Sequence, residues 1–402
     1  MKKNIFVFLS LFLSLLLLGC GTPQKKKSRI IDSDERITKS PLRDVFNNMN
    51  DEGDYYYVSD KWVIHDPSKI MKIGNYLMIG VTGKAQEDGY KCGLETWYLF
   101  PNENKFVPGQ CLLEEKPKWV DEYVPTSDGA YWAPGFLDSR TMYYSVPSGN
   151  AMENAEGTES CIGLLKATGN PPNLVWKDIG KPITCSEKGE NNKKVPEPES
   201  IDPAVFVDDD GKSYLIYGGG HIWLTEVDKK KGIQINGDHW AYDNDDYTLL
   251  SNGPKVDEDG NKTDEEMWIE AAYMVKKGLY YYLFVNWYHC CKGVDSTYEI
   301  RVGRSTSVRG PFLDSNGKSM IKDGGGDLFI DKSSGLIGPG HSGVFSFKNK
   351  KGETIDLFSF HFYPKSGNPW ASMKVRKIFW EKGWPKLLEK DFDFFNYWSS
   401  KK

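Results

Sequence analysis

The chain has 402 residues and a formal net charge of −5, and it contains 13 Trp, 22 Tyr and 20 Phe. This balance argues against a nucleic-acid-binding protein, which would carry a basic stripe. Many aromatic side chains at low net charge instead suit an uncharged ligand with apolar faces, such as a sugar ring. The length allows one large domain or two ordinary ones.

The first twenty residues predict an export signal. Two lysines precede a 14-residue apolar stretch, Ile5 to Leu18, which is shorter than the roughly 20 residues that a membrane-spanning helix needs. The closing Leu-Leu-Gly-Cys resembles the bacterial lipoprotein cleavage box, which implies that Cys20 is lipidated and anchors the chain to a bacterial membrane. Residues 21–45 then form a polar linker. Secretion with cleavage nearby is the alternative.

Beyond the linker, short β-rich runs closed by turn signals replace helical periodicity. Asp210-Gly211 and Lys277-Gly278 each separate two alternating apolar runs and predict hairpin turns. The main runs are 76–81, 96–100, 141–146, 204–219, 271–287, 298–305, 343–363 and 373–380. The sequence therefore predicts an all-β protein.

Strand pairs recur at a nearly constant interval. They begin near residues 62, 131, 202, 269 and 341, so the spacings are 69, 71, 67 and 72 residues. Units of this length with about four strands each are typical of β-propeller blades, and five of them would close a ring. We therefore predict a five-bladed β-propeller over residues 46–395, with a two-domain β-sandwich protein as the alternative.

Three carboxylates fall at the starts of these units. Asp66 precedes Pro67, and read alone such an Asp-Pro pair is an ordinary turn. In a propeller, however, the first strand of every blade lines the central channel, so Asp66, Asp202 and Glu270 would converge on one mouth. Glycoside hydrolysis needs one protonated acid and one ionised base. The apolar neighbours of Glu270 predict a raised pKa for that carboxyl.

Longer motifs at the same places resemble a known family. They are HDPS at 65–68, AYWAP at 130–134, SIDPAVFVDDDGKSYLIYGG at 200–219, WIEAAYM at 268–274, CCKGVDSTYEIRVGRS at 290–305 and GPGHSGV at 338–344. Together they resemble the family 43 glycoside hydrolases, five-bladed propellers, and most of all the arabinanases among them. The resemblance implies that Asp66 is the general base, that Glu270 is the general acid, and that Asp202 tunes Glu270 and orients the sugar. It also implies inversion at the anomeric carbon, with about 6.5–9.5 Å between base and acid carboxyls.

The same resemblance implies a metal ion. His341, in GPGHS, matches the family histidine that faces a metal, often calcium, in the channel below the active site. Such an ion would add positive charge near Asp66 and help to keep it ionised. Without the family match, a histidine in a Gly-Pro loop is usually structural.

Four further residues are candidates for substrate binding. Trp132 is a candidate stacking platform for a furanose ring, although blade packing explains most tryptophans equally well. Ser200, His221 and Asn286 lie within or next to matched segments and are predicted to line the pocket.

Six cysteines remain besides Cys20, and an even number in an exported chain permits disulfides. Proximity alone suggests Cys92 with Cys111 and Cys161 with Cys185. The adjacent Cys290 and Cys291 fit either a vicinal disulfide or two thiols with separate partners, and the resemblance favours the vicinal bridge.

We thus expect an exported, monomeric enzyme that acts on α-1,5-linked arabinan or a related arabinose-containing polysaccharide. The alternatives are an exo-acting arabinofuranosidase or β-xylosidase of the same fold, and a non-catalytic surface glycan-binding propeller. Gly135 stands where arabinanases usually have Asp after Trp-Ala-Pro, which leaves the shape of the subsites open.

Overall fold

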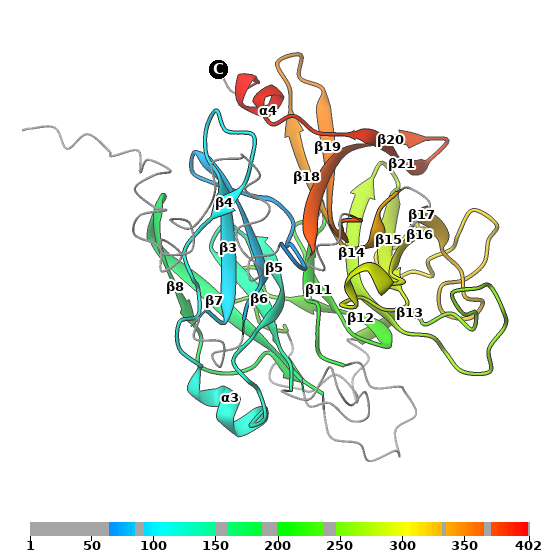
Figure 1. Cartoon of the computed structure of the whole chain (residues 1–402), viewed down its shortest axis with the longest axis horizontal. Coiled ribbons are helices and arrows are strands. Elements are labelled where there is room, and N and C mark those ends of the chain that lie inside the picture. Colours follow the sequence, from blue (N-terminus) through cyan, green and yellow to red (C-terminus); the bar gives the residue numbers. More distant parts are fainter. Residues whose placement is uncertain are drawn as a thin grey trace, which may run out of the picture.

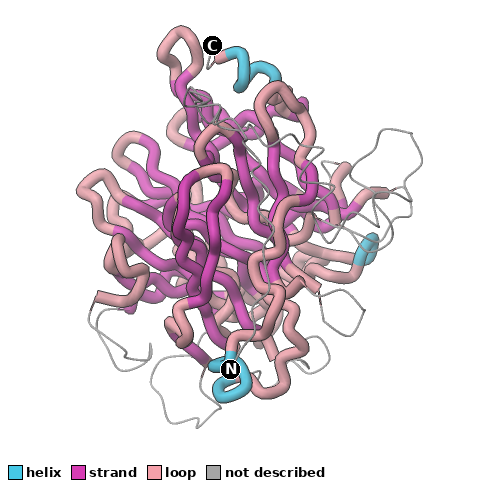
Figure 2. The backbone as a smooth tube through the Cα atoms, turned by 90° about the vertical axis from the view of Figure 1, so that its left-hand side faces the viewer, coloured by secondary structure: helices cyan, strands magenta, loops and turns pink. Residues whose placement is uncertain are grey.

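The computed structural model describes residues 64–84, 92–148, 160–186, 199–235, 247–331, 335–365 and 371–400. The predicted signal peptide with Cys20 and the predicted linker at 21–45 lie outside these described residues. The helices within them are short, and none has both the length and the hydropathy that a membrane crossing requires. Figure 2 shows a fold built almost entirely of strands.

The strands form five antiparallel sheets, each from one continuous part of the chain. The first blade contains β1 (Met71–Ile73), β2 (Tyr76–Thr82), β3 (Leu94–Leu99) and β4 (Val107–Pro108). The second contains β5 (Trp132–Asp138), β6 (Thr141–Val146), β7 (Cys161–Asn170), β8 (Asn173–Asp178) and β9 (Thr184–Cys185). The third contains β10 (Ala204–Val207), β11 (Ser213–Tyr217), β12 (His221–Val227) and β13 (Tyr247–Asn252).

The fourth blade contains β14 (Ile269–Lys277), β15 (Tyr280–Trp287), β16 (Glu299–Ser305) and β17 (Asp327–Ile330). The fifth contains β18 (Ile337–Lys348), β19 (Thr354–Tyr363), β20 (Ser372–Glu381) and β21 (Trp384–Asp391). The described residues include three short helices. The helix α3 (Lys118–Tyr123) joins the first and second blades, η2 (Gly293–Asp295) lies between β15 and β16, and α4 (Phe395–Ser399) follows the fifth blade. The predicted five-bladed β-propeller is confirmed.

Apolar side chains that alternate between the two faces of each strand explain why the blades pack in a ring. In β2, Tyr76 and Met78 face the second blade, whereas Leu77 and Ile79 face the fifth. Successive side chains of a strand point to opposite faces, so each sheet offers an apolar face to both neighbours. Five hydrophobic clusters result, each between two adjacent blades.

The ring closes where the two ends of the described chain meet. Strands of the fifth blade, orange to red in Figure 1, lie beside the blue and cyan strands of the first. The helix α4 starts at residue 395, the predicted end of the domain, and Trp398 Nε1 donates a hydrogen bond to the carbonyl of Glu103 at 2.8 Å. The folded unit therefore extends to the end of α4.

The predicted turns and disulfides are present. Val207 pairs with Ser213 across the Asp210-Gly211 turn, and Lys277 pairs with Tyr280 across Gly278. All three suggested disulfides form: Cys92–Cys111, Cys161–Cys185 and Cys290–Cys291. A Cβ on Gly135 would lie 1.8 Å from the carbonyl oxygen of Pro203. A side chain at position 135 would therefore require the second and third blades to separate.

One backbone feature repeats in every blade. Within five residues of the start of each innermost strand, one non-glycine residue has a left-handed backbone: Asp66, Ala133, Asp202, Ala271 and His341, with φ of 45°, 46°, 55°, 52° and 55°. Such a conformation costs roughly 1–2 kcal/mol for a residue with a Cβ, so the surrounding structure must enforce it.

Hydrogen bonds between blades hold these five corners. Four of the corner N–H groups donate to a side chain near the end of the second strand in the preceding blade. The pairs are Asp66 to His361 at 3.2 Å, Ala133 to Thr82 at 3.0 Å, Asp202 to Ser145 at 2.9 Å and His341 to Asn286 at 3.1 Å. The fifth N–H, that of Ala271, donates to the Asp202 carboxylate at 3.0 Å. The propeller thus brings Asp66, Asp202, His341 and the backbone next to Glu270 close together.

Candidate active site

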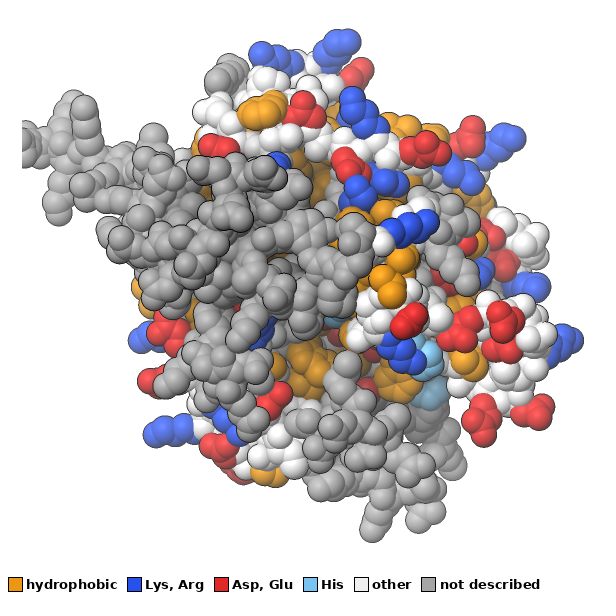
Figure 3. Space-filling view, viewed as in Figure 1, with side chains coloured by type: hydrophobic (Ala, Val, Ile, Leu, Met, Phe, Trp, Pro, Cys, Tyr) orange, Lys and Arg blue, Asp and Glu red, His pale blue; other side chains and the backbone are white. Residues whose placement is uncertain are grey.

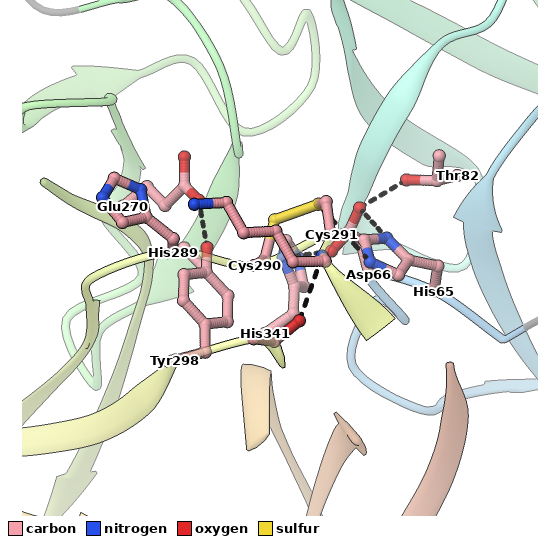
Figure 4. The surroundings of a disulfide bond; sticks show 12 residues. His65, Asp66, Thr82, Glu270, His289, Cys290, Cys291, Tyr298 and His341 are labelled. Carbon is pink, nitrogen blue, oxygen red and sulfur yellow. Dashed lines mark hydrogen bonds and ion pairs between the residues drawn. A yellow bond between two sulfur atoms is a disulfide. The ribbon is translucent and has the colours of Figure 1, made fainter. Parts of the chain in front are cut away.

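Asp66 is anchored through one of its two carboxylate oxygens (Figure 4). Its Oδ2 accepts hydrogen bonds from Nδ1 of His65 at 2.7 Å and from the hydroxyl of Thr82 at 2.6 Å. The Asp66 side chain is 14% exposed, so it is buried without being sealed from the channel. An ordinary turn at Asp66-Pro67 would not explain these hydrogen bonds of the Asp66 carboxylate.

The surroundings of Asp66 favour its ionised form. Burial alone would raise its pKa, but the charge of His65 and the hydrogen bond that His65 donates hold the pKa of Asp66 well below its usual range. Burial opposes the charge on His65 in turn, yet the Asp66 carboxylate and Tyr363 raise the pKa of His65 to about 10. The two residues form an ion pair at neutral pH.

The second oxygen of Asp66 remains open to a proton. Nδ1 of His361 lies 3.4 Å from Oδ1, but it already accepts the backbone N–H of Asp66. The His361 proton therefore resides on Nε2. Burial and the neighbouring His65 also lower the pKa of His361 to about 4, so this ring is neutral. Oδ1 can therefore take a proton from a water molecule.

The surroundings of Glu270, in contrast to those of Asp66, favour the neutral form of the carboxyl group. Its Oε2 accepts the indole N–H of Trp268 at 2.7 Å, and its Oε1 accepts the hydroxyl of Tyr298. Burial raises the pKa of Glu270 to about 7 even though both hydrogen bonds oppose the rise. An indole N–H can only donate, so the proton of the neutral acid belongs on Oε1.

Asp202 is buried and feels the negative charges of both other carboxyls. Burial and the negative charges of Glu270 and Asp66 raise its pKa well above the usual range, while the N–H of Ala271 opposes the rise. That N–H belongs to the residue after Glu270, so Asp202 also fixes the backbone that carries the acid. The three predicted catalytic carboxyls are thus brought together and electrostatically coupled.

The predicted substrate-binding residues fall into two groups. Trp132 begins β5 and is partly exposed, and it precedes the left-handed Ala133 just as Glu270 precedes Ala271. His221 begins β12, is partly exposed, and contacts Asn252 at 3.1 Å. Ser200 and Asn286 have no exposed surface. Both predictions of sugar contact are therefore corrected: these two side chains lie inside the blades, where Asn286 holds the backbone of His341.

His341 is compatible with a metal ligand. Its Nδ1 lies 3.6 Å from Oδ1 of Asp66, and burial lowers its pKa. A neutral imidazole is the form that binds metals. Calcium prefers six to eight oxygen ligands, and Asp66 is the carboxylate beside His341. His341 and Asp66 offer one nitrogen and one oxygen ligand for a cation.

Several functional side chains were missed in the sequence analysis. His65 and Thr82 anchor Asp66, Trp268 and Tyr298 hydrogen-bond to Glu270, and Tyr363 contacts His65 at 2.8 Å. His65 and Trp268 carried a visible signal, because they lie one and two residues from Asp66 and Glu270. Thr82, Tyr298 and Tyr363 depend on contacts between segments distant in sequence, which only the folded ring creates.

The described face in Figure 3 mixes positive and negative side chains, and acidic side chains gather at its lower right. The histidines visible in that view lie beside apolar side chains. Such a surface suits an uncharged ligand better than a polyanion.

Comparison with known proteins agrees with this geometry. The profile of the family described as glycosyl hydrolases family 43 matches residues 111–385. The extracellular exo-α-(1→5)-L-arabinofuranosidase ArbA of Cellvibrio japonicus is 29% identical, with 75% of this chain and 85% of that protein covered. The extracellular endo-α-(1→5)-L-arabinanase 1 of Bacillus subtilis is 28% identical, covering 80% and 87%. The structure of Cellvibrio cellulosa α-L-arabinanase complexed with arabinohexaose superposes with a TM-score of 0.63 at 25% identity, covering 82% of this chain and 96% of that one.

Proposed function

The chain belongs to glycoside hydrolase family 43, and from this premise we propose that it hydrolyses α-1,5-linked L-arabinan or a related arabinose-containing polysaccharide with inversion. The observation that carries the proposal is the opposite displacement of two carboxyl pKa values at one channel mouth. The pKa of Asp66 is depressed and that of Glu270 is raised to about 7. One fold thereby supplies a base and an acid at the same pH.

In the proposed reaction, Oδ1 of Asp66 accepts a proton from water while the water oxygen attacks the anomeric carbon. The glycosidic C–O bond breaks, and its oxygen takes the proton from Oε1 of Glu270. Afterwards Asp66 is protonated and Glu270 is ionised, so solvent must exchange one proton at each before the next turnover. By accepting the N–H of Ala271, Asp202 fixes the backbone that carries Glu270, and burial and the negative charge of Glu270 raise the pKa of Asp202 in turn.

The choice of arabinan rests on the relatives, whose names specify α-(1→5)-linked arabinose polymers. We propose endo action first. Exo action is the second candidate, because one relative is named as an exo-arabinofuranosidase. Debranched arabinan, xylan and galactan are incubated with the protein, and the products are separated by chromatography. Arabino-oligosaccharides support endo action and arabinose alone supports exo action. Xylose alone would support the β-xylosidase alternative. Binding of a polysaccharide without release of products would support a non-catalytic glycan-binding propeller.

Inversion has its own test. Proton NMR of the first-formed sugar from an α-linked substrate should show the β-anomer before mutarotation mixes the two forms. An initial α-anomer would contradict direct attack by water and would require a covalent sugar intermediate on Asp66.

We also propose a calcium ion held by His341. Bound there, it would supply positive charge that favours the ionised form of Asp66. Elemental analysis of the purified protein and a thermal shift with calcium after chelation test this. Absence of metal together with an unchanged melting temperature would refute the proposed calcium site.

Export and anchoring are proposed from the N-terminal sequence and from the relatives described as extracellular. We expect detergent-phase partitioning of the expressed full chain, lost on Cys20→Ser. Release of the wild-type protein into the medium would favour plain secretion. A monomer is expected, and light scattering measures the mass.

A further inference from the structure

The Cys290–Cys291 disulfide lies beside the general base although it is 225 residues from Asp66 in sequence. Figure 4 places the disulfide between Glu270 and Tyr298 on one side and His65 and Asp66 on the other. Cys291 is exposed and Cys290 is partly exposed, so the bridge reaches the surface. From this position the disulfide can influence the geometry of Asp66 and Glu270.

Hydrogen bonds connect the bridge to the base in three steps. The backbone N–H of Cys291 donates to the hydroxyl oxygen of Tyr363 at 2.9 Å. That hydroxyl is 2.8 Å from Nε2 of His65, and Nδ1 of His65 is 2.7 Å from Oδ2 of Asp66. The Sγ of Cys291 also lies 3.8 Å from Nε2 of His65. The disulfide therefore contacts His65 directly and through Tyr363.

This connection fixes which nitrogen of His65 faces the base. If His65 is neutral, the Tyr363 hydroxyl donates to Nε2, and the ring proton must be on Nδ1. If His65 is charged, both nitrogens carry protons and the Tyr363 oxygen accepts one of them. In both states an Nδ1–H is directed at Oδ2 of Asp66, which leaves Oδ1 free for water. The stacking of His65 on His361, with ring centroids 4.5 Å apart, fixes the plane of the ring.

We propose that the Cys290–Cys291 disulfide and Tyr363 are positioning residues for the general base, and that they act through His65. The bridge holds the Cys291 N–H at the Tyr363 hydroxyl, the hydroxyl orients His65, and His65 holds Asp66 with Oδ1 toward water. The inference rests on the proposed hydrolase function, because it assigns a role within that site. A disulfide that only stiffened the loop would not be expected to affect the catalytic rate alone. The proposed positioning role predicts that its removal lowers the catalytic rate without lowering substrate affinity.

The test compares Tyr363→Phe, Cys290→Ala/Cys291→Ala and the combined triple variant, with kcat and KM measured on arabinohexaose. Because small misplacement of a reacting group is costly, we expect each change to lower kcat by about tenfold with KM nearly constant. The triple variant should be no slower than the more impaired of the two, since both changes break one connection. Tyr143→Phe is the matched control, because it removes a buried hydroxyl that hydrogen-bonds to Gly232 in another part of the ring.

A second measurement does not depend on activity. In protein labelled with ¹⁵N-histidine, the Nδ1–H of His65 should give a strongly downfield proton resonance, assigned by its absence in His65→Gln. The resonance should weaken or shift in Tyr363→Phe and in the double cysteine variant, and persist in Tyr143→Phe. Circular dichroism checks that each variant is folded.

Some results would overturn the proposal. They are an unchanged kcat in both variants, a rise in KM alone, rate losses that multiply in the triple variant, or an unchanged His65 resonance. If the wild-type protein releases no sugar from any polysaccharide, the proposed function fails instead. The resonance then still decides whether the disulfide positions His65.

Discussion

Tyr298→Phe should move the pH range in which the enzyme works. The substitution removes the hydroxyl that donates to Oε1 of Glu270 and keeps the buried ring, which stacks against His361 with centroids 6.0 Å apart. A hydrogen bond to an ionised group is worth about 1.5–3 kcal/mol and one to a neutral group about 1 kcal/mol. The difference is about one pKa unit.

The direction follows from which form of Glu270 the hydroxyl stabilises. Its donation favours the ionised carboxylate and lowers the pKa. Its removal should therefore raise the pKa of Glu270 from about 7 to roughly 8. Since the acid must be protonated to act, the basic limb of kcat/KM against pH should shift upward by about one unit.

The assay is kcat/KM on arabinohexaose across the pH range, with Tyr143→Phe as the control that removes a remote hydroxyl. Trp268→Phe removes the other hydrogen bond, at 2.7 Å to Oε2, and should shift the same limb in the same direction. A basic limb that stays in place, or that moves to lower pH, in Tyr298→Phe would refute the assignment of Glu270 as the acid that this limb reports.

The other predictions concern the acid itself and the stability of the ring. Glu270→Gln should lower kcat by about 10²–10⁴-fold while calorimetry still detects arabinohexaose binding; hydrolysis near the wild-type rate would exclude Glu270 as the acid. Phe284→Ala should lower the free energy of unfolding by about 3–5 kcal/mol, because Phe284 is fully buried between the fourth and fifth blades; a loss below about 1 kcal/mol in urea unfolding would contradict this packing. Cys161→Ala/Cys185→Ala opens a bridge across a sequence separation of 24 and should cost roughly 3 kcal/mol by chain entropy; an unchanged calorimetric melting temperature would show that the bridge adds no stability.

The sequence was sufficient to predict the ring and its three carboxyls for one physical reason. A blade repeat of about seventy residues returns the chain to the channel each time, so Asp66, Asp202 and Glu270 can be located by spacing alone. Their roles also required unequal environments, and the apolar neighbours of Glu270 already indicated its raised pKa.

Contacts between blades could not be predicted in this way. Tyr363 of the fifth blade contacts His65 of the first across a separation of 298 residues. Within the fourth blade, the contact of Tyr298 with Glu270 across 28 residues also depends on how the strands pair. Ser200 and Asn286 were placed in the pocket because they are close to matched motifs, yet both are fully buried. Neighbourhood in sequence does not tell to which side of a blade a side chain points.

The five left-handed corners suggest a way to redesign the molecule. The same backbone bend carries an acid at positions 66 and 202, an imidazole at 341 and a bare methyl group at 133 and 271. Side-chain chemistry at these corners is therefore separable from the path of the chain. The methyl groups of Ala133 and Ala271 are buried, so a larger side chain at either corner would need space made for it by a smaller neighbour.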